Sequence, residues 1–294
     1  MRVHLVDGTF ELFRAHFAPR PPHRGRDGRP LTACHGLAQN LLALLDDRDE
    51  APTHLAIAFD NPIRSFRNDL FDGYKTEDGV PAELLAQFDE AERVSAALGL
   101  VTWRMDRWEA DDALATAARR FRDEVEQVRI LSPDKDLGQC LDGQRVVQVD
   151  RVRRKLIDEA ALRERRGVGP QSIPDLLALV GDTADGIPGI PGFGEKTAAA
   201  LLAHYLHVEA IPDDPAAWAV PVRGAARLAG ELAPRRRELA LYKRLATLVE
   251  DVPLPESLEG LCWRGADREA WSQWCADADA DELRERPRRF RDGS

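Results

Sequence analysis

The chain has little of what marks secreted or membrane-spanning proteins. Its 294 residues include only four cysteines, which are far apart and form no CxxC pair: Cys34, Cys140, Cys262 and Cys275. Such a set predicts reduced thiols in a cytosolic protein. No apolar run approaches the length of a membrane span, and the N-terminal MRVHLVDG is typical of an opening strand, not of a signal peptide. We therefore expect a cytoplasmic protein that has no contact with a membrane.

An excess of positive charge is also lacking. The chain has 41 basic and 51 acidic residues, a formal net charge of −10. This balance argues against a protein that coats nucleic acid through bulk positive charge. The basic residues still form three clusters, which permit a polyanionic partner without requiring one: Arg20, Arg24, Arg26 and Arg29; Arg151, Arg153, Arg154 and Lys155; and Arg235, Arg236 and Arg237.

The first half of the chain alternates between strand and helix patterns. Strands are predicted over 2–7, 53–60, 100–105, 128–136 and 145–150, and helices over 36–47, 80–99 and 109–121. This alternation predicts an α/β fold with a mainly parallel central sheet flanked by helices. From about residue 158 the pattern is helical only, over 173–181, 195–206 and 234–249. We expect an α/β domain at 1–157, a helical subdomain at 158–260, and a C-terminal helix with a disordered tail at 261–294.

Acidic residues stand out by their positions. Asp7, Asp60 and Asp134 each follow an apolar strand, and Asp136 comes two residues later. In an open parallel sheet the carboxyl ends of the strands line one crevice. The helix that begins at WEADDA adds Glu109, Asp111 and Asp112, and Asp182 and Asp185 repeat a three-residue spacing before a Gly/Pro-rich loop. Taken singly, each acid is also explained as a helix or turn cap.

Together these nine carboxylates predict a metal site. Like charges a few ångströms apart raise one another's pKa, and hard divalent cations resolve that conflict. Oxygen ligands without His or Cys favour Mg²⁺ or Mn²⁺ and argue against zinc. Two such ions roughly 3.5–4 Å apart suit in-line displacement at phosphate. The site's own charge would account for most of the net −10, leaving the remaining surface close to neutral.

Five segments resemble the 5′-nuclease (flap endonuclease) family, which includes the 5′–3′ exonuclease domain of bacterial DNA polymerase I. VDG, AFD, EADD, DKDLGQ and GDTADGIPGIPGFGEKTA occur in the family's order and at similar spacing, over roughly residues 1–255. The resemblance implies that the nine acids bind two or more Mg²⁺ ions, for which Mn²⁺ substitutes. It also implies a helix–three-turn–helix element that grips duplex DNA through Gly189, Gly192, Gly194, Lys196 and Thr197, with K⁺ in its loop.

The same resemblance assigns catalytic roles to four residues. Arg14 in LFRAHF, Arg67 in SFRNDL, and Tyr74 and Lys75 in GYK match the family's basic and aromatic positions. They are expected to hold and polarise the scissile phosphate, with the tyrosine stacked on or near the substrate. A phosphoryl transition state needs cations opposite the metals. Simple packing of Tyr74 and a surface salt bridge at Arg14 are the structural alternatives.

The sequence departs from the family at several points. The family usually follows YK with another basic residue, whereas residues 76–78 read TED, a change that bears on threading of a single 5′ strand. The segment before the Pro81 helix is short, so any arch over the site is small. Gly186 replaces a common Asn, and Ser132 and Pro133 replace the usual Thr-Gly or Thr-Ala. No polymerase domain follows, so we expect a freestanding protein.

The sequence therefore predicts a metal-dependent 5′–3′ exonuclease and structure-specific 5′-flap endonuclease. Its expected partner is DNA with 5′ ends, flaps or nicks, including RNA primer–DNA, and it is expected to be a monomer. A metal-dependent phosphatase is disfavoured, because its DxDGT motif needs two aspartates two residues apart, and residue 5, where the first would stand before Asp7, is Leu. A non-catalytic or weakly active branched-DNA binder and a PIN-type ribonuclease remain the alternatives; the ribonuclease lacks GIPGIPGFGEKTA.

Overall fold

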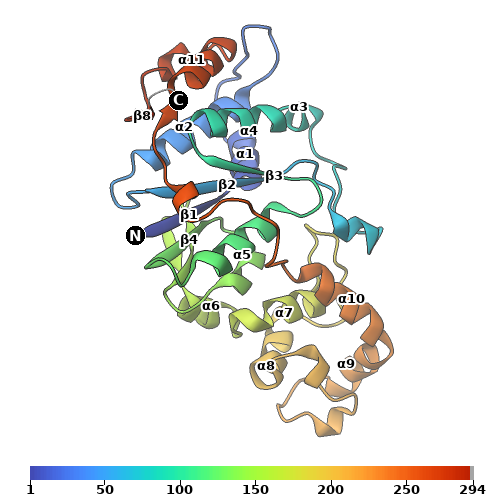
Figure 1. The fold of residues 1–294 in the computed structure, drawn as a ribbon. Coiled ribbons are helices and arrows are strands. Elements are labelled where there is room, and N and C mark those ends of the chain that lie inside the picture. Colours follow the sequence, from blue (N-terminus) through green and yellow to red (C-terminus); the bar gives the residue numbers. More distant parts are fainter. Residues whose placement is uncertain (292–294) are drawn as a thin grey trace. The chain divides into compact units, whose positions relative to one another are not determined.

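The computed structural model describes residues 1–291 and divides into two compact units (Figure 1). The first unit, unit 1, comprises residues 1–63, 77–132 and 250–294, and the second, unit 2, comprises 64–76 and 133–249. Each unit draws on separate stretches of chain, a division that differs from the consecutive domains expected from the sequence. The boundaries at 157/158 and 260/261 stay a prediction. No helix within 1–291 is long and apolar enough to cross a membrane.

Unit 1 is built on parallel strands, as the strand–helix alternation predicts. The strands are β1 (Arg2–Asp7), β2 (His54–Asp60), β3 (Val101–Met105) and β4 (Gln127–Leu131), in the order β3-β2-β1-β4. In the register Val6 pairs with Ile57 on one side and with Leu131 on the other. All three side chains are buried, because parallel strands of this kind are covered on both faces. The predicted α/β class with a mainly parallel sheet is confirmed.

Helices cover both faces of these strands (Figure 1). One face carries α1 (Gly8–Phe17), α2 (Thr32–Leu45), α3 (Ala82–Leu85) and α4 (Phe88–Ala97), and the other carries α5 (Ala110–Phe121). The single helix predicted over 80–99 is broken between α3 and α4. The buried Gln87 lies at this break, and its Oε1 accepts hydrogen bonds from the amides of Ala33 and Cys34. It therefore caps α2, which has no side-chain cap of its own.

The C-terminal segment adds α11 (Arg268–Asp277) and a two-residue parallel pair, β7 (Ala266–Asp267) with β8 (Phe290–Arg291). On α11 the indole rings of Trp271 and Trp274 stack with centroids 5.2 Å apart. The tail ERPRRFRDGS was expected to be disordered, but its residues 285–291 are placed and end in β8; its last three residues lie outside the described part of the chain. Strand pairing at β7 and β8 also departs from the purely helical pattern expected after residue 158.

Unit 2 joins an antiparallel strand pair to a helical cluster. The pair is β5 (Val146–Asp150) with β6 (Lys155–Ile157), and the helices are α6 (Glu159–Arg166), α7 (Ile173–Val180), α8 (Glu195–Tyr205), α9 (Ala225–Leu232) and α10 (Arg236–Ala246). Their apolar stripes form one core, which includes Leu179, Leu201, Leu202, Leu232 and Leu239. This core fixes the loop between α7 and α8, which carries the Gly/Pro-rich motif.

A partly buried carboxylate ties the turn after α2 to two strands of unit 1. Glu50 Oε2 lies 3.0 Å from His4 Nε2 and 2.6 Å from Arg129 Nη1. Burial alone would raise the pKa of Glu50, but the hydrogen bonds and charges of His4 and Arg129 outweigh it and lower the pKa to about 2. Stability from this carboxylate is thus fully present above its unfolded pKa and is lost as the pH falls toward 2.

Glu50→Gln should lower the free energy of unfolding at pH 7 by about 2–3 kcal/mol, since one pKa unit corresponds to about 1.4 kcal/mol. Urea denaturation of both proteins between pH 7 and pH 2.5 measures the difference. The gap should narrow below about pH 4.5, where the unfolded Glu50 becomes protonated. A gap that stays constant with pH would contradict an ionic contribution.

Candidate metal centre and nucleic-acid interface

Two predicted acids of unit 1 sit at strand ends and contact helix N-termini. Asp7 is the N-cap of α1: its Oδ1 accepts from the Phe10 amide at 2.8 Å, and its Oδ2 accepts from Ser132 Oγ at 2.8 Å. Asp60 Oδ1 accepts from the Ala110 amide at 2.6 Å, at the first residue of α5. Both carboxylates are more than nine-tenths buried. Asp7 and Asp60 therefore each lie at the end of a strand, as the strand-end pattern predicts, and each also contacts the start of a helix.

The acids of EADD divide into two kinds. Glu109 and Asp112 form a capping box at the start of α5, in which Asp112 Oδ2 accepts from the Glu109 amide at 2.9 Å. Asp112 has no exposed surface and Glu109 is 4% exposed. Asp111, in contrast, is partly exposed. The cap explains why Asp112 is acidic at this position, and its predicted metal contact stays a prediction.

Unit 2 gathers the other acids. Carboxylate oxygens of Asp136, Asp182 and Asp185 all lie within 4.8 Å of one another. Asp134 belongs to the same turn, and its Oδ1 accepts from the Asp136 amide at 2.9 Å. The loop that carries Asp182 is closed by two backbone hydrogen bonds between Asp182 and Ile187, of 2.7 and 2.8 Å. The short turn thereby brings Asp182 and Asp185 to one place.

Burial and neighbouring charges oppose ionisation of Asp134 and Asp136 in this cluster. Burial raises the pKa of Asp136 well above its usual range, and the charges of Asp134, Asp185 and Asp182 raise it further. Burial also raises the pKa of Asp134, an effect that the Asp136 amide offsets only in part. Two lysines lie in the cluster: Lys135 Nζ is 2.7 Å from Asp182 Oδ2, and Lys75 Nζ is 3.1 Å from Asp185 Oδ1. The two ammonium groups do not cancel the repulsion.

The residues of this cluster fit a hard divalent cation. The ligands are all carboxylate oxygens, which Mg²⁺ and Mn²⁺ prefer. Asp136 Oδ1 is buried and has no hydrogen-bond partner among the described residues, although buried oxygens are nearly always paired. A cation would satisfy this oxygen and relieve the repulsion that helps to raise the pKa values of Asp134 and Asp136.

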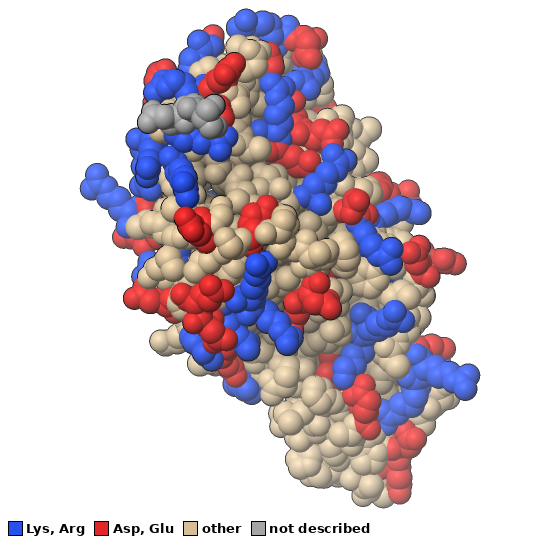
Figure 2. All heavy atoms as spheres, in the orientation of Figure 1, with Lys and Arg blue, Asp and Glu red and all other residues tan. Residues whose placement is uncertain are grey.

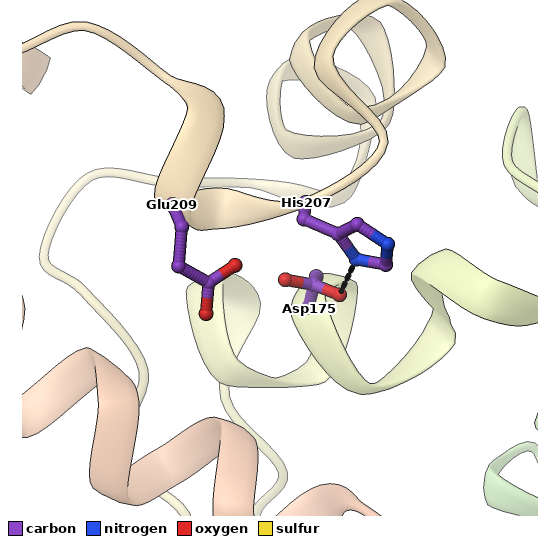
Figure 3. A group of neighbouring side chains, drawn as sticks. All are labelled: Asp175, His207 and Glu209. Carbon is purple, nitrogen blue, oxygen red and sulfur yellow. Dashed lines mark hydrogen bonds and ion pairs between the residues drawn. The ribbon is translucent and has the colours of Figure 1, made fainter.

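In a second group of possible metal ligands in unit 2, a lysine pairs with the carboxylates. Asp175, His207 and Glu209 also bring their ligand atoms within 4.8 Å of one another, and His207 Nδ1 lies 3.0 Å from Asp175 Oδ2 (Figure 3). Here, however, Lys243 Nζ lies 2.8 Å from both Asp175 Oδ1 and Glu209 Oε2. Burial would raise the pKa of Glu209, but Lys243 outweighs it and the pKa is lowered. The ammonium of Lys243 already occupies the position that a metal cation would take. The group therefore serves to join α10 to α7.

The predicted phosphate-contacting arginines are both held by the protein. Arg14 pairs with Glu11 one turn earlier in α1, and Glu11 also accepts from Asn40 Nδ2 at 3.3 Å. Arg67 is 1% exposed, and its Nε and Nη2 donate to the carbonyls of Leu245 and Thr247 at 2.8 and 3.0 Å. These bonds attach the 64–76 segment to the end of α10. Contact of either guanidinium with phosphate stays a prediction.

Tyr74 is buried, as the packing alternative expects, and its stacking on or near the substrate stays a prediction. Its side chain is 3% exposed and belongs to the hydrophobic core of unit 2, so its ring packs inside the protein. This packing positions the next residue: the Lys75 amide donates to the Asp185 carbonyl at 3.0 Å, and Asn68 Nδ2 donates to the Lys75 carbonyl at 2.9 Å. Lys75 is thus held on both sides of its backbone.

Gly186 allows this arrangement. It has a φ of +75°, and a Cβ there would lie 2.1 Å from the Gly73 carbonyl oxygen. Gly186→Ala should therefore destabilise unit 2 by about 2–4 kcal/mol, because both a left-handed backbone and a backbone clash are imposed. Gly79→Ala is the matched control, since its φ is +85° and no atom lies within 4 Å of a Cβ. Equal losses of melting temperature in both variants would refute the packing explanation.

The loop after this turn leads into α8. Gly189 and Gly192 have φ values of +72° and +85°, which favour glycine, and Gly194 is the N-cap of α8 with open space around its missing Cβ. Lys196 is exposed and Thr197 partly exposed in the first turn of α8. An exposed helix start at Gly194, where the space around the backbone is open, suits close approach of an anion.

Comparison with known families covers almost the whole chain. Residues 2–167 match the model of the 5′-3′ exonuclease N-terminal resolvase-like domain, and residues 168–269 match that of the 5′-3′ exonuclease C-terminal SAM fold. The chain belongs to the 5′–3′ exonuclease family. Its members are nucleases, and the α/β and helical parts predicted from the sequence correspond to these two models.

Relatives of this chain include DNA polymerases I. It is 35% identical to DNA polymerase I of Mycobacterium leprae over 273 residues, which are 90% of this chain and 29% of that protein. It is 40% identical to DNA polymerase I of Rhizobium leguminosarum over 207 residues, which are 68% of this chain and 20% of that protein. The chain therefore spans less than a third of the length of these relatives.

Solved structures share the fold at lower identity. The bacteriophage T5 5′-exonuclease aligns over 97% of this chain and 99% of its own, with a TM-score of 0.63 and 18% identity. The catalytic core of Rad2 in complex with DNA substrate aligns over 96% of this chain and 90% of its own, with a TM-score of 0.59 and 13% identity. Both matches support the fold of the exonuclease family.

Sequence reasoning missed several residues that shape the site. Lys135 lies between two predicted ligands in DKD and pairs with a third acid, Asp182; its position in the motif is a signal that could have identified it. Ser132 holds Asp7 from the end of β4. The guanidinium of Arg227 in α9 occupies the space that a Cβ of Gly192 would take, a tertiary contact that leaves no local signal in the sequence.

Proposed function

We propose that this chain is a divalent-metal-dependent 5′–3′ exonuclease and 5′-flap endonuclease that hydrolyses DNA phosphodiester bonds. The observation that carries the proposal is the carboxylate cluster Asp136–Asp182–Asp185 with its unpaired buried oxygen. Family membership supports the reaction class. The bacteriophage T5 flap endonuclease, which has the same fold at 19% identity and a TM-score of 0.64, was solved with DNA and metal ions.

The proposed mechanism assigns metal binding to both sets of acids. Asp134, Asp136, Asp182 and Asp185 of unit 2, and Asp7, Asp60, Glu109, Asp111 and Asp112 of unit 1, hold two or more Mg²⁺ ions, with Mn²⁺ as a substitute. Bound in pairs, such ions activate water and stabilise the leaving oxygen of an in-line displacement. The proposed ion count, the identity of the metal and K⁺ in the α8 loop rest on the donor chemistry and on the resemblance.

The chain's own cations complete the proposed site. Lys75 is held by two backbone hydrogen bonds and supplies an ammonium that can leave Asp185 for a phosphate oxygen once the carboxylate has a stronger partner. Arg14 and Arg67 offer further positive charge to the phosphate. Because a phosphoryl transition state gathers negative charge on its oxygens, fixed cations stabilise it more than the ground state.

The proposed substrate is DNA with a 5′ end, flap or nick, including RNA primer–DNA, bound by a monomer. The acidic Glu77 and Asp78 after Lys75 favour short or weakly threaded 5′ strands. A panel of 5′-labelled flap, nicked, gapped, overhang and single-stranded DNAs tests the proposal with Mg²⁺, with Mn²⁺ and with EDTA. Metal-dependent release of products from 5′ ends or flaps is expected. Tight binding without cleavage would favour the junction binder, and cleavage of RNA alone the PIN-type ribonuclease.

Lys196 is proposed to contact a DNA phosphate beside Gly194. Lys196→Ala should weaken duplex binding and reduce the slope of log K against log salt by about 1. The control is Arg244→Ala, which removes an exposed cation from α10. Fluorescence anisotropy over a range of salt concentrations measures both slopes, and an unchanged slope for Lys196→Ala would refute the contact.

A further inference from the structure

The basic cluster 151–155 has no part in the function proposed above, yet the structure connects it to α6 and α8 within unit 2. Two open hollows lie along this path. One, of about 440 Å³, is lined by Arg153, Lys155 and Arg165 among others, and the next, of about 420 Å³, by Arg165, Arg166 and Lys196. Arg165 lines both. We name the five residues Arg153, Lys155, Arg165, Arg166 and Lys196 the basic band.

The charges of the basic band are only partly neutralised. Arg153 pairs with Asp150 at 3.0 Å, and Arg166 pairs with Glu195. Lys155, Arg165 and Lys196 have no carboxylate within ion-pair distance in the described part of the chain. On the face shown in Figure 2, basic and acidic side chains are closely interspersed. Three unpaired cations along two adjoining hollows therefore mark a binding surface for an anion that extends over several contacts.

The residues that line the two hollows leave room for a large partner. The floor of the second hollow consists of Gly167, Ala199, Ala200 and Ala203, whose small side chains let a partner come close to the backbone. Val152 in the turn between β5 and β6 and Leu156 in β6 are 60% and 48% exposed. Lys196 at the far end is the residue proposed above to contact a DNA phosphate. The band thus continues a proposed DNA contact away from the α8 loop.

We propose that the basic band binds the phosphate backbone of the DNA duplex arm beyond the contacts made at the α8 loop. The inference rests on the proposed function. It adds one expectation: the protein prefers substrates whose duplex arm is long enough to reach the β5–β6 turn. Each lysine or arginine that meets a phosphate releases counterions, so the band contributes to affinity and to its salt dependence without reading sequence.

The test compares two flap substrates whose duplex arms differ by one helical turn, about 10 base pairs. Anisotropy with Ca²⁺ in place of Mg²⁺ measures binding by wild type, by the double variant Lys155→Ala/Arg165→Ala, and by Arg165→Glu. Wild type should bind the longer arm about tenfold more tightly, and the double variant should lose that advantage, with a salt slope lower by about 2 on the long arm only. Cleavage of the short-arm flap at saturating DNA should be unchanged.

The matched control is Arg163→Ala on the same helix, because Arg163 is paired with Glu159 at 2.7 Å and lines neither hollow. It should keep the arm-length preference. Three outcomes would each overturn the proposed role of the basic band while leaving cleavage and the proposed function in place. They are equal losses of DNA affinity in Arg163→Ala and the double variant, equal losses on both arms, and an unchanged arm-length preference in the double variant. A wild type that binds neither arm would overturn both proposals.

Discussion

Asp136→Asn should lower kcat for DNA cleavage by at least about 10³-fold. It removes the negative charge of a carboxylate that is proposed to bind the metal. Asn is nearly the same size, so the change alters charge more than packing. The folded protein should gain stability, since burial and three neighbouring carboxylates oppose ionisation of Asp136 and raise its pKa. Single-turnover cleavage with Mg²⁺ and thermal unfolding with EDTA measure the two effects in one preparation.

Asp175→Asn is the control for this experiment. It makes the same chemical change at a carboxylate that is fully buried and already bonded to Lys243, His207 and the Val208 amide. Cleavage should persist, and the free energy of unfolding should fall by about 2–3 kcal/mol, because a charged hydrogen-bond network is broken. A variant of Asp136 that is destabilised but still cleaves DNA would show that this cluster is structural and not the metal centre.

Lys75→Met should lower kcat by about 10²- to 10³-fold while changing the Kd for DNA by less than about threefold. The ammonium is proposed to act on charge that develops in the transition state, so its removal costs rate more than binding. The aliphatic length is retained over the Tyr74 ring, which lies 5.7 Å from Nζ. Rapid-quench kinetics at saturating DNA measure kcat, and anisotropy measures Kd.

Lys135→Met separates this role from simple charge balance, since Lys135 also pairs with an acid of the cluster, at 2.7 Å from Asp182. It should lower kcat by less than about tenfold, because its backbone is not fixed against the 182–187 turn as that of Lys75 is. Equal losses in the two lysine variants would mean that net charge near the acids matters and that the position of Lys75 does not.

Much of the fold was predictable because it depends on local patterns. The strands at 2–7 and 53–60 read as short apolar runs that end in Asp, and the structure has β1 and β2 at these residues. Periodicity placed the helices around 110–121 and 195–205 to within about one residue. The expected positions of Asp7 and Asp60 at strand ends are also found, since the carboxyl ends of parallel strands lie along one edge; their role as metal ligands stays a prediction.

What the sequence could not reveal depends on tertiary packing. The resemblance of GYK to the family assigns Tyr74 to the substrate and leaves simple packing as the alternative, and only the structure shows that the ring is buried among the helices of unit 2. The replacement of Asn by Gly at 186 had no explanation until the Gly73 carbonyl was found beside it. Nor does spacing distinguish the group around Asp175, where Lys243 pairs with two acids, from the group around Asp136, where Asp136 Oδ1 has no partner among the described residues.

The central claim is that carboxylates of this chain hold divalent ions that act together in cleaving DNA. The most direct measurement is the single-turnover cleavage rate of a 5′-labelled flap as a function of Mg²⁺ concentration. At low Mg²⁺ the logarithm of the rate should rise against the logarithm of concentration with a slope approaching 2, as expected for two ions, and cleavage should stop in EDTA. A rate that is independent of Mg²⁺ and survives EDTA would contradict the account.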